Sequence, residues 1–249
     1  MKTKLLIAAG LVGVSCLMSC EKAEDTLPKL EAVDDVCTKM DDINFMKYCY
    51  DNFDVNKDGK VSMPEANAVK EISDFKNPSL LKVVSYTGIE YFSSLEKIQL
   101  GAYNTKTEVR TMDLRYNNRL TSISLNSATH ISSLDLRSNN ELKNVNMYGC
   151  AELISIYLPK SIEYIPASAF RGCEKLSIVD MSQCVNLKEI KGDDTFSSEV
   201  IDEFLIGATV PPQTSITADR PIKSKSIKTL KVPAESVEAY ESSVWESYP

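Results

Sequence analysis

Twelve residues between Asp54 and Glu65, DVNKDGKVSMPE, carry oxygen-bearing side chains at regular positions. These side chains stand at the first, third, fifth, ninth and twelfth places, and Gly59, at the sixth, permits a sharp turn. Calcium binds about six to eight oxygen ligands that converge from such a loop, where the seventh residue gives its backbone carbonyl and the ninth often acts through water. We therefore predict a calcium site formed by Asp54, Asn56, Asp58, Lys60, Ser62 and Glu65, in which Glu65 supplies both carboxylate oxygens.

The spacing of apolar residues predicts a helix on each side of this loop, as in an EF-hand. Met46, Cys49 and Phe53 recur at helical spacing before the loop, and Ala68, Val69, Ile72 and Phe75 do so after it. Asp42 is the expected N-cap of the first helix, while Ser62 and Glu65 form a capping box for the second, with Pro64 in its first turn. The alternative is an acidic turn between two helices that binds no metal. EF-hands usually come in pairs, and the sequence contains one such loop, which favours a structural role for calcium over a sensing role.

Beyond this region, a unit of the form apolar-x-x-apolar-x-apolar recurs every eleven residues. Its five regular copies are Val109-Met112-Leu114, Leu120-Ile123-Leu125, Ile131-Leu134-Leu136, Leu142-Val145-Met147 and Leu153-Ile156-Leu158; Leu95-Ile98-Leu100 precedes them, and Leu176-Val179-Met181 and Leu187-Ile190-Gly192 follow. The alternation at the end of each unit predicts a short strand, and stacked units bury an apolar side that one unit cannot bury alone. The stretch DLRYNNRL, which begins at Asp113, recurs as DLRSNNEL two units later, from Asp135. One coil is therefore expected to hold two units, as in leucine-rich repeats.

One inward position of each unit carries Asn, Cys or Ala. The residues there are Asn117, Ala128, Asn139, Cys150, Cys173 and Cys184. We expect these side chains to bond the backbone of neighbouring coils, and the three cysteines to be buried thiols rather than disulfide partners or zinc ligands. Cys37 and Cys49 flank the first predicted helix, and a disulfide between them is left open, since it is permitted in an exported protein.

The N-terminus has the features of an export signal. Lys2 and Lys4 precede an apolar run, residues 5–18, which is shorter than the roughly 20 residues that a spanning helix needs. Leu17-Met18-Ser19-Cys20 resembles the bacterial lipobox, which implies lipidation of Cys20; simple secretion is the alternative. We expect a signal peptide over 1–20 and a flexible acidic tether over 21–35.

Composition excludes several function classes. The net charge of −7 argues against nucleic-acid binding and against electrostatic docking on anionic membranes. His130 is the sole histidine, and the sequence contains no nucleophile elbow, phosphate loop or HExxH motif. We therefore predict that the protein is not an enzyme; a carboxylate pair of the glycoside-hydrolase kind is the remaining enzymatic alternative.

Four stretches carry a resemblance to a family. They are INFMKYCYDNFDVNKDGKVSMPEA, GIEYFSSLEKIQL, LISIYLPKSIEYIPASAFRGCEKLSIV and LKVPAESVEAYESSVW. Together they resemble the BspA-like leucine-rich-repeat surface lipoproteins of Gram-negative anaerobes. The resemblance implies an EF-hand cap before the repeats, a closing strand and helix with Trp245 packed at the end, and adhesion-type contact with other macromolecules without catalysis. The chain departs from the family in having one AF-x-GC unit and an irregular stretch, ADRPIKSKS, near Asp219.

The expected architecture is thus an α+β repeat solenoid, a short leucine-rich-repeat coil of short parallel strands between two helical caps. The helix–calcium loop–helix cap is placed at 36–78, the repeat domain at 79–232 and the C-terminal capping helix at 233–249.

An outward row one coil apart is the candidate partner face. It contains Asp113, Asp135, Tyr157 and Asp180, with Arg115 and Arg137 in a neighbouring row. The alternative is a solvated face with weak ion pairs. We expect an extracellular protein or glycan as partner, no nucleic acid, a monomer, and attachment to the bacterial outer membrane, on the cell surface, by the N-terminal lipid alone. The competing functions are a surface glycan-binding or glycan-utilisation component and a dockerin-like calcium-dependent assembly module, which would need a second loop.

Overall fold

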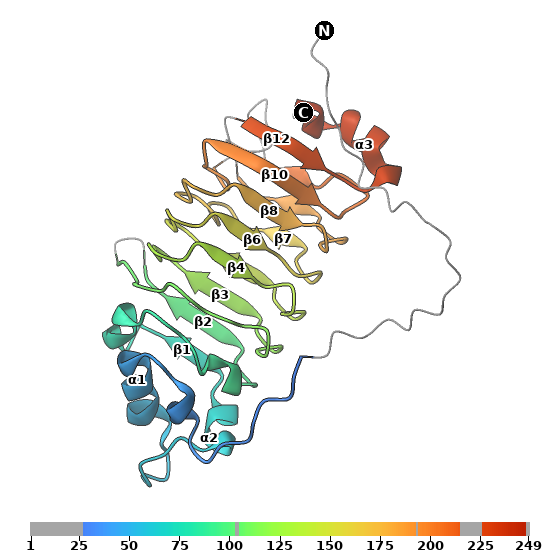
Figure 1. Cartoon of the computed structure of the whole chain (residues 1–249). Coiled ribbons are helices and arrows are strands. Elements are labelled where there is room, and N and C mark those ends of the chain that lie inside the picture. The colour runs from blue at the N-terminus through green and yellow to red at the C-terminus, as the bar shows by residue number, and fades with distance from the viewer. Residues whose placement is uncertain (1–26, 103–104, 193, 215–225, 248–249) are drawn as a thin grey trace, which may run out of the picture.

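The chain winds into a parallel-strand solenoid of about six turns with short helices at both ends (Figure 1). The structure, a computed structural model, describes residues 27–102, 105–192, 194–214 and 226–247. The predicted signal peptide, Cys20 and the first part of the predicted tether lie outside the described residues. Within them, no helix has both the length and the apolar character needed to cross a membrane.

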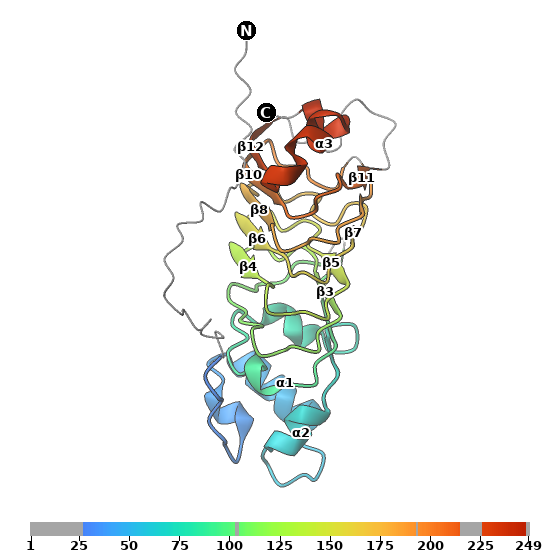
Figure 2. The same ribbon diagram turned by 90° about the vertical axis from the view of Figure 1, so that its right-hand side faces the viewer.

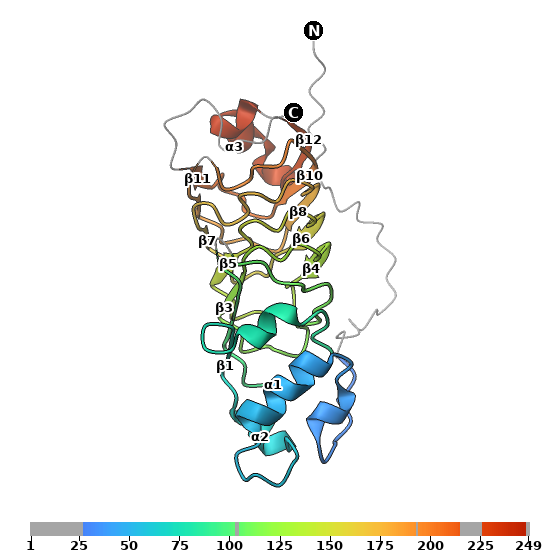
Figure 3. The same ribbon diagram turned by 90° about the vertical axis from the view of Figure 1, so that its left-hand side faces the viewer.

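The strands form two sides of the solenoid, which Figures 2 and 3 show edge-on. The β3 side contains β1 (Glu71–Ser73), β2 (Lys97–Leu100), β3 (Ser122–Leu125), β5 (Asn144–Asn146), β7 (Tyr164–Ile165), β9 (Glu189–Ile190) and β11 (Gln213–Thr214). The β6 side contains β4 (Ser133–Asp135), β6 (Ser155–Tyr157), β8 (Ile178–Met181), β10 (Val200–Ile206) and β12 (Ser226–Lys231). Every pair of neighbouring strands is parallel, as stacked coils require.

The register confirms that one coil holds two units. Ile123 of β3 pairs with Val145 of β5 on one side, and Leu134 of β4 pairs with Ile156 of β6 on the other. Each of these four side chains is buried, so the apolar positions of successive units form one continuous core. The unit that contains Met112 is less regular, because it forms a single bridge, between Thr111 and Ser85, in place of a strand.

The inward Asn and Cys side chains bond neighbouring coils, as predicted. The Asn139 amide donates to two backbone carbonyls of the preceding coil at 2.9 and 3.0 Å, and Asn117 makes the same pair of bonds one coil earlier. The Cys150 thiol donates to a carbonyl at 2.8 Å, and Cys173 and Cys184 repeat this contact. All five described cysteines, which also include Cys37 and Cys49, are buried free thiols.

The N-terminal end is formed by a 3-10 turn (Val36–Lys39), α1 (Ile43–Phe53) and α2 (Met63–Ala68), and further 3-10 turns at Pro78–Lys82 and Ile89–Tyr91 follow β1. Phe45 of α1 packs on Tyr86, with 4.8 Å between the ring centroids, and so joins the helix to the first coil.

The prediction that the second helix continues to Phe75 is wrong. The helix ends at Ala68, and residues 71–73 form β1, whose Ile72 is buried against Ile98 of β2. The segment forms a strand, despite its helical spacing of apolar residues, because pairing with β2 buries Ile72 in the solenoid core. Phe75 is left 81% exposed. The solenoid therefore begins at residue 71, before the predicted boundary at 79.

Residues 27–35, the second part of the predicted tether, lie against folded residues. Leu30 and Val33 are partly buried against the core, and the Tyr116 hydroxyl donates to the Pro28 carbonyl at 2.9 Å. Asp35 caps the first turn, since its side chain accepts from Cys37 N–H.

At the C-terminal end, α3 (Val237–Glu241) lies between two 3-10 turns, Ala234–Ser236 and Val244–Ser247. Trp245 is 1% exposed, and its indole N–H donates to the Pro212 carbonyl at 3.0 Å. Its ring lies 6.0 Å from that of Phe204 in β10, so Trp245 covers the last coils of the core.

Candidate metal centre and interaction face

The predicted calcium loop connects α1 to α2, and local side chains fix both of its ends. Asp42 caps α1 by accepting hydrogen bonds from the backbone N–H groups of Asn44 and Phe45 at 2.8 and 3.2 Å. At the other end, the Glu65 carboxylate accepts from the Ser62 backbone N–H at 2.9 Å, which is the return half of a capping box. The helices thus hold the two ends of the loop in place.

Inside the loop, polar side chains accept hydrogen bonds from backbone N–H groups that follow them in the chain. Asp54 Oδ2 accepts from Gly59 N–H at 3.0 Å, Asn56 Oδ1 accepts from Asp58 N–H at 2.9 Å, and Asp58 Oδ1 accepts from Lys60 N–H at 2.9 Å. Gly59 has a φ of +86°, so an L side chain at this place would be strained. These hydrogen bonds link the predicted ligand residues Asp54, Asn56, Asp58 and Lys60 to one another or to Gly59 within the loop.

Glu65 closes the loop and is ionised at neutral pH. Its carboxylate accepts from the Val55 N–H at 2.8 Å as well as from Ser62. Hydrogen bonds from the Ser62 backbone and then from the Ser62 hydroxyl lower the pKa of Glu65 to about 2. Oε1 also accepts from the Asn56 N–H at 3.3 Å and Oε2 from the Ser62 hydroxyl at 2.7 Å, so a cation would bind this carboxylate in place of some of these hydrogen bonds.

Asp54 provides the test of whether the residues fit a cation. It is only 7% exposed, and its Oδ1 is buried without a hydrogen-bond partner among the described groups. A buried, unpaired carboxylate oxygen is costly, and a calcium ion would satisfy it. No group of three His, Cys, Asp or Glu side chains in the described ranges is gathered into a ready metal cluster, so the site would also need the Asn56 amide and the Lys60 carbonyl. Such a mixed oxygen set suits calcium.

The predicted partner row lies on the outer surface of the β6 side. Asp135, Tyr157 and Asp180 occupy paired positions on β4, β6 and β8. The Arg137 guanidinium donates to the Asp135 carboxylate at 2.6 Å and lies 4.7 Å from the centre of the Tyr157 ring. The structure therefore brings these four residues together as one surface.

Asp113 and Arg115 extend this surface by one coil. They form the same ion pair, at 2.6 Å, beside a hollow of about 660 Å³ that Tyr116 also lines. The bonded Arg115 side chain lowers the pKa of Asp113, and Arg137 lowers the pKa of Asp135 in the same way. Both carboxylates are thus fixed charges at neutral pH.

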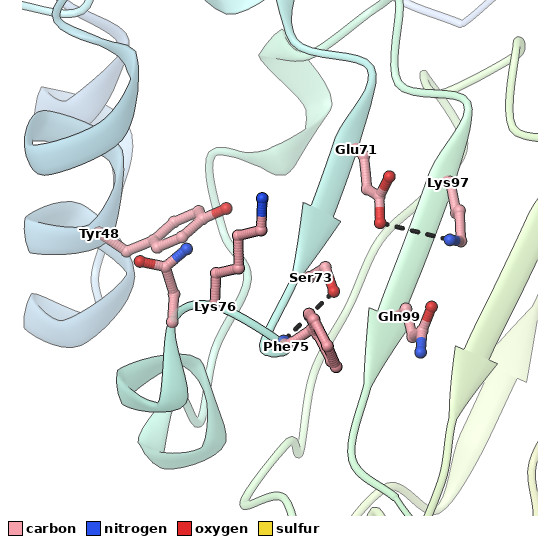
Figure 4. A pocket seen from close by; sticks show the side chains of 8 residues that line it. Tyr48, Glu71, Ser73, Phe75, Lys76, Lys97 and Gln99 are labelled. Atoms are coloured by element: carbon pink, nitrogen blue, oxygen red, sulfur yellow. Dashed lines mark hydrogen bonds and ion pairs between the residues drawn. The ribbon is translucent and has the colours of Figure 1, made fainter.

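The predictions from sequence missed a hollow of about 450 Å³ between α1 and the start of the β3 side (Figure 4). Tyr48 of α1 lies on one side of it and Gln99 of β2 on the other, with Phe75 and Asn77 on the segment after β1. The Glu71 carboxylate and the Lys97 ammonium are 3.3 Å apart at its margin. The hollow was missed because Phe75 was assigned to a helix. The polar–apolar–polar alternation of Glu71, Ile72 and Ser73 is typical of a strand and was the signal that could have predicted it.

A comparison with known protein families agrees with this fold. A family model described as "BspA type Leucine rich repeat region", in six copies, matches residues 77–202 and 126–228. No curated protein matches the chain. Among solved structures, the chain is similar to two internalins of Listeria monocytogenes strain 4b F2365, internalin C2 and InlF, each with 13% sequence identity and a TM-score of 0.33. The match to internalin C2 covers 82% of this chain and 100% of that one; the match to InlF covers 84% of this chain, which spans 60% of InlF.

Proposed function

The chain belongs to the BspA-type leucine-rich repeat family, and we propose that it is a calcium-stabilised interaction protein held on the bacterial outer membrane surface by a lipid on Cys20. It binds an extracellular protein through the partner row Asp113, Arg115, Asp135, Arg137, Tyr157 and Asp180. The observation that carries this proposal is the paired placement of Asp135, Tyr157 and Asp180 on three consecutive strands of the β6 side.

The chemistry of the row favours a protein partner. Arg and Tyr are enriched at the energetically important centres of protein interfaces. Because Arg137 is bonded to Asp135 and lies over Tyr157, it is already ordered before a partner arrives, which lowers the entropic cost of binding. The row of carboxylates and the arginines beside it select a partner with the complementary pattern of charges.

Calcium has a structural role in this proposal. The ion is held by side-chain oxygens of Asp54, Asn56, Asp58 and Glu65, by the Lys60 carbonyl and by Ser62 through water. It fixes α1 against α2, and α1 in turn packs on the first coil through Phe45 and Tyr86. The region 36–70 is therefore a cap that closes the N-terminal end of the core, as α3 and Trp245 close the other end.

The proposal includes no catalytic step. The side chain of His130, the sole histidine, lies 3.0 Å from Glu108 on the surface.

The test is a binding experiment with a matched control on the opposite side of the solenoid. The chain with Cys20→Ser, which removes the lipid site, is applied to an array of purified extracellular proteins. We expect a protein ligand whose affinity falls at least about tenfold in the Tyr157→Ala, Arg137→Glu double variant and is unchanged in Asn144→Ala. Equal binding by the double variant would exclude this surface as the site.

A further inference from the structure

The β3 side of the solenoid presents an uncharged polar row that is unlike the charged β6 side. Ser73, Gln99, Ser124 and Asn146 occupy successive paired positions on β1, β2, β3 and β5. A second row beside it runs from Lys97 through Ser122 to Asn144. All the outward positions of β3 and β5 therefore carry hydroxyl or amide groups and no charge.

The amides of these rows are available for a ligand. In the described part of the chain, the side chains of Gln99, Ser124 and Asn144 make no hydrogen bond to protein groups, and Asn146 uses only its oxygen, to accept from the Tyr148 N–H at 3.0 Å. A primary amide offers two donors and an acceptor, and a hydroxyl offers one donor and two acceptor lone pairs. Such groups match the hydroxyl pairs of a sugar ring.

Exposed aromatic rings stand at both ends of the polar rows. Phe75 is 81% exposed at the margin of the 450 Å³ hollow, with Asn77 and Tyr48 near it (Figure 4). Tyr164 of β7 is 44% exposed beside a second hollow, of about 570 Å³, which Asn144 also lines. Aromatic faces stack on the apolar faces of sugar rings, whereas amides bind the hydroxyls at their edges.

The charges near the rows favour an uncharged chain. Lys97 is paired with Glu71 at 3.3 Å, Lys188 with Glu163, and Lys191 lies 4.0 Å from Glu189. Lys76 lines the hollow at one end, and Lys143 lines the hollow at the other end together with Glu163. Lysines therefore stand at the two ends, three of them beside carboxylates, and the outward positions of β3 and β5 between them carry no charge. Neighbouring strands lie about 4.8 Å apart, close to the length of one hexose unit, so successive strands can contact successive sugars.

We propose that the β3 side binds a neutral polysaccharide, which lies across β1, β2, β3 and β5 between Phe75 and Tyr164. This site goes beyond the proposed protein-binding function and lies on the other side of the solenoid. Variants on the two sides therefore separate the failure of one proposal from the failure of the other.

Affinity electrophoresis of the Cys20→Ser chain tests this site. The gels contain soluble neutral polysaccharides (glucans, mannan and arabinoxylan) or anionic ones (polygalacturonate and heparin). We expect retardation by at least one neutral polysaccharide, with little change between about 50 and 300 mM salt, since no charge is neutralised. The Gln99→Ala, Asn144→Ala double variant should lose at least about tenfold in affinity and Phe75→Ala severalfold, because these exposed substitutions remove contacts and leave the core intact.

The Tyr157→Ala, Arg137→Glu variant is the matched control and should be retarded like the unmodified chain. Three results would overturn the proposal: no retardation by any neutral polysaccharide, retardation only by anionic polysaccharides with loss at high salt, or retardation that survives both β3-side variants.

Discussion

The carboxylate of Glu65, the last residue of the calcium loop, accepts a hydrogen bond from the backbone N–H of Val55, the second residue, at 2.8 Å. The same carboxylate accepts from Ser62 at the start of α2. One side chain therefore joins the beginning of the loop to its end, at the position where the calcium ion is proposed to bind.

This arrangement predicts an acid-sensitive loop. The pKa of Glu65 is lowered to about 2 in the folded chain, against about 4.3 when unfolded, so its contribution to stability is complete above the unfolded pKa and is lost as pH falls through the folded one. We expect the Val55 and Ser62 amide signals, followed by NMR without calcium, to shift between about pH 5 and pH 2. In Glu65→Gln these signals should show no transition with a midpoint near 2; a transition that persists there would assign the shift to another group.

Removing calcium should open the N-terminal cap and leave the solenoid closed. At about 1 mM calcium, a site with a dissociation constant of about 0.1 mM stabilises the folded form by about 1.4 kcal/mol, which corresponds to about tenfold fewer openings. Cys37 and Cys49 report on the cap because both are buried there, and burial together with the neighbouring Cys37 raises the pKa of the Cys49 thiol.

The measurement is alkylation with iodoacetamide, followed residue by residue by mass spectrometry. A chelator should speed modification of Cys37 and Cys49 about tenfold, while Cys150, Cys173 and Cys184 stay protected. Equal acceleration at all five thiols would mean that calcium acts on the whole molecule and not on the cap.

The inward asparagines should contribute strongly to stability. Asn139→Ala removes two buried hydrogen bonds to the Leu114 and Asn117 carbonyls, each of which keeps one backbone bond, so we expect a loss of roughly 1–3 kcal/mol in the free energy of unfolding. The neighbouring Asn140 is exposed, and Asn140→Ala should change the free energy of unfolding by less than about 0.5 kcal/mol. Urea denaturation measures both variants, and similar losses in the two would show that the inward bonds are not essential.

The partner row should contribute little to the fold. The ion pair of Arg137 with Asp135 is exposed, and such pairs are worth at most about 1 kcal/mol. We therefore expect the Tyr157→Ala, Arg137→Glu variant to lose at most about 1–2 kcal/mol in urea denaturation. A larger loss would show that these residues are needed for the structure, and the binding test would then require single substitutions.

The sequence was informative where each side chain acts within a repeated local pattern. The spacing of units such as Leu120-Ile123-Leu125 predicted the coils, and the shared position of Asn139 and Cys150 predicted their buried hydrogen bonds. The turn chemistry of the loop predicted the cap of α1 at Asp42 and the return bond of Glu65.

Sequence reasoning was less successful where distant pairing decides the structure. β10 was not predicted, because its residues depart from the eleven-residue spacing and are aligned by pairing with β8 and β12. β1 was assigned to a helix for a similar reason. Ile72 fits a helical spacing of apolar residues, and its pairing with Ile98 of β2 cannot be seen from the local sequence. The uncharged rows of the β3 side were missed because they become visible only when strands about one coil apart are placed side by side.

A calcium titration tests the central claim, that one loop holds the cap onto a repeat solenoid. Isothermal titration calorimetry of the chelator-treated Cys20→Ser chain should give one calcium per molecule, with at least about tenfold weaker binding in Glu65→Gln. The control is Asp51→Asn, which changes an exposed carboxylate of α1 that is paired with Lys47 and should leave calcium binding native. Absence of calcium binding at millimolar concentration, or native affinity in Glu65→Gln, would contradict it.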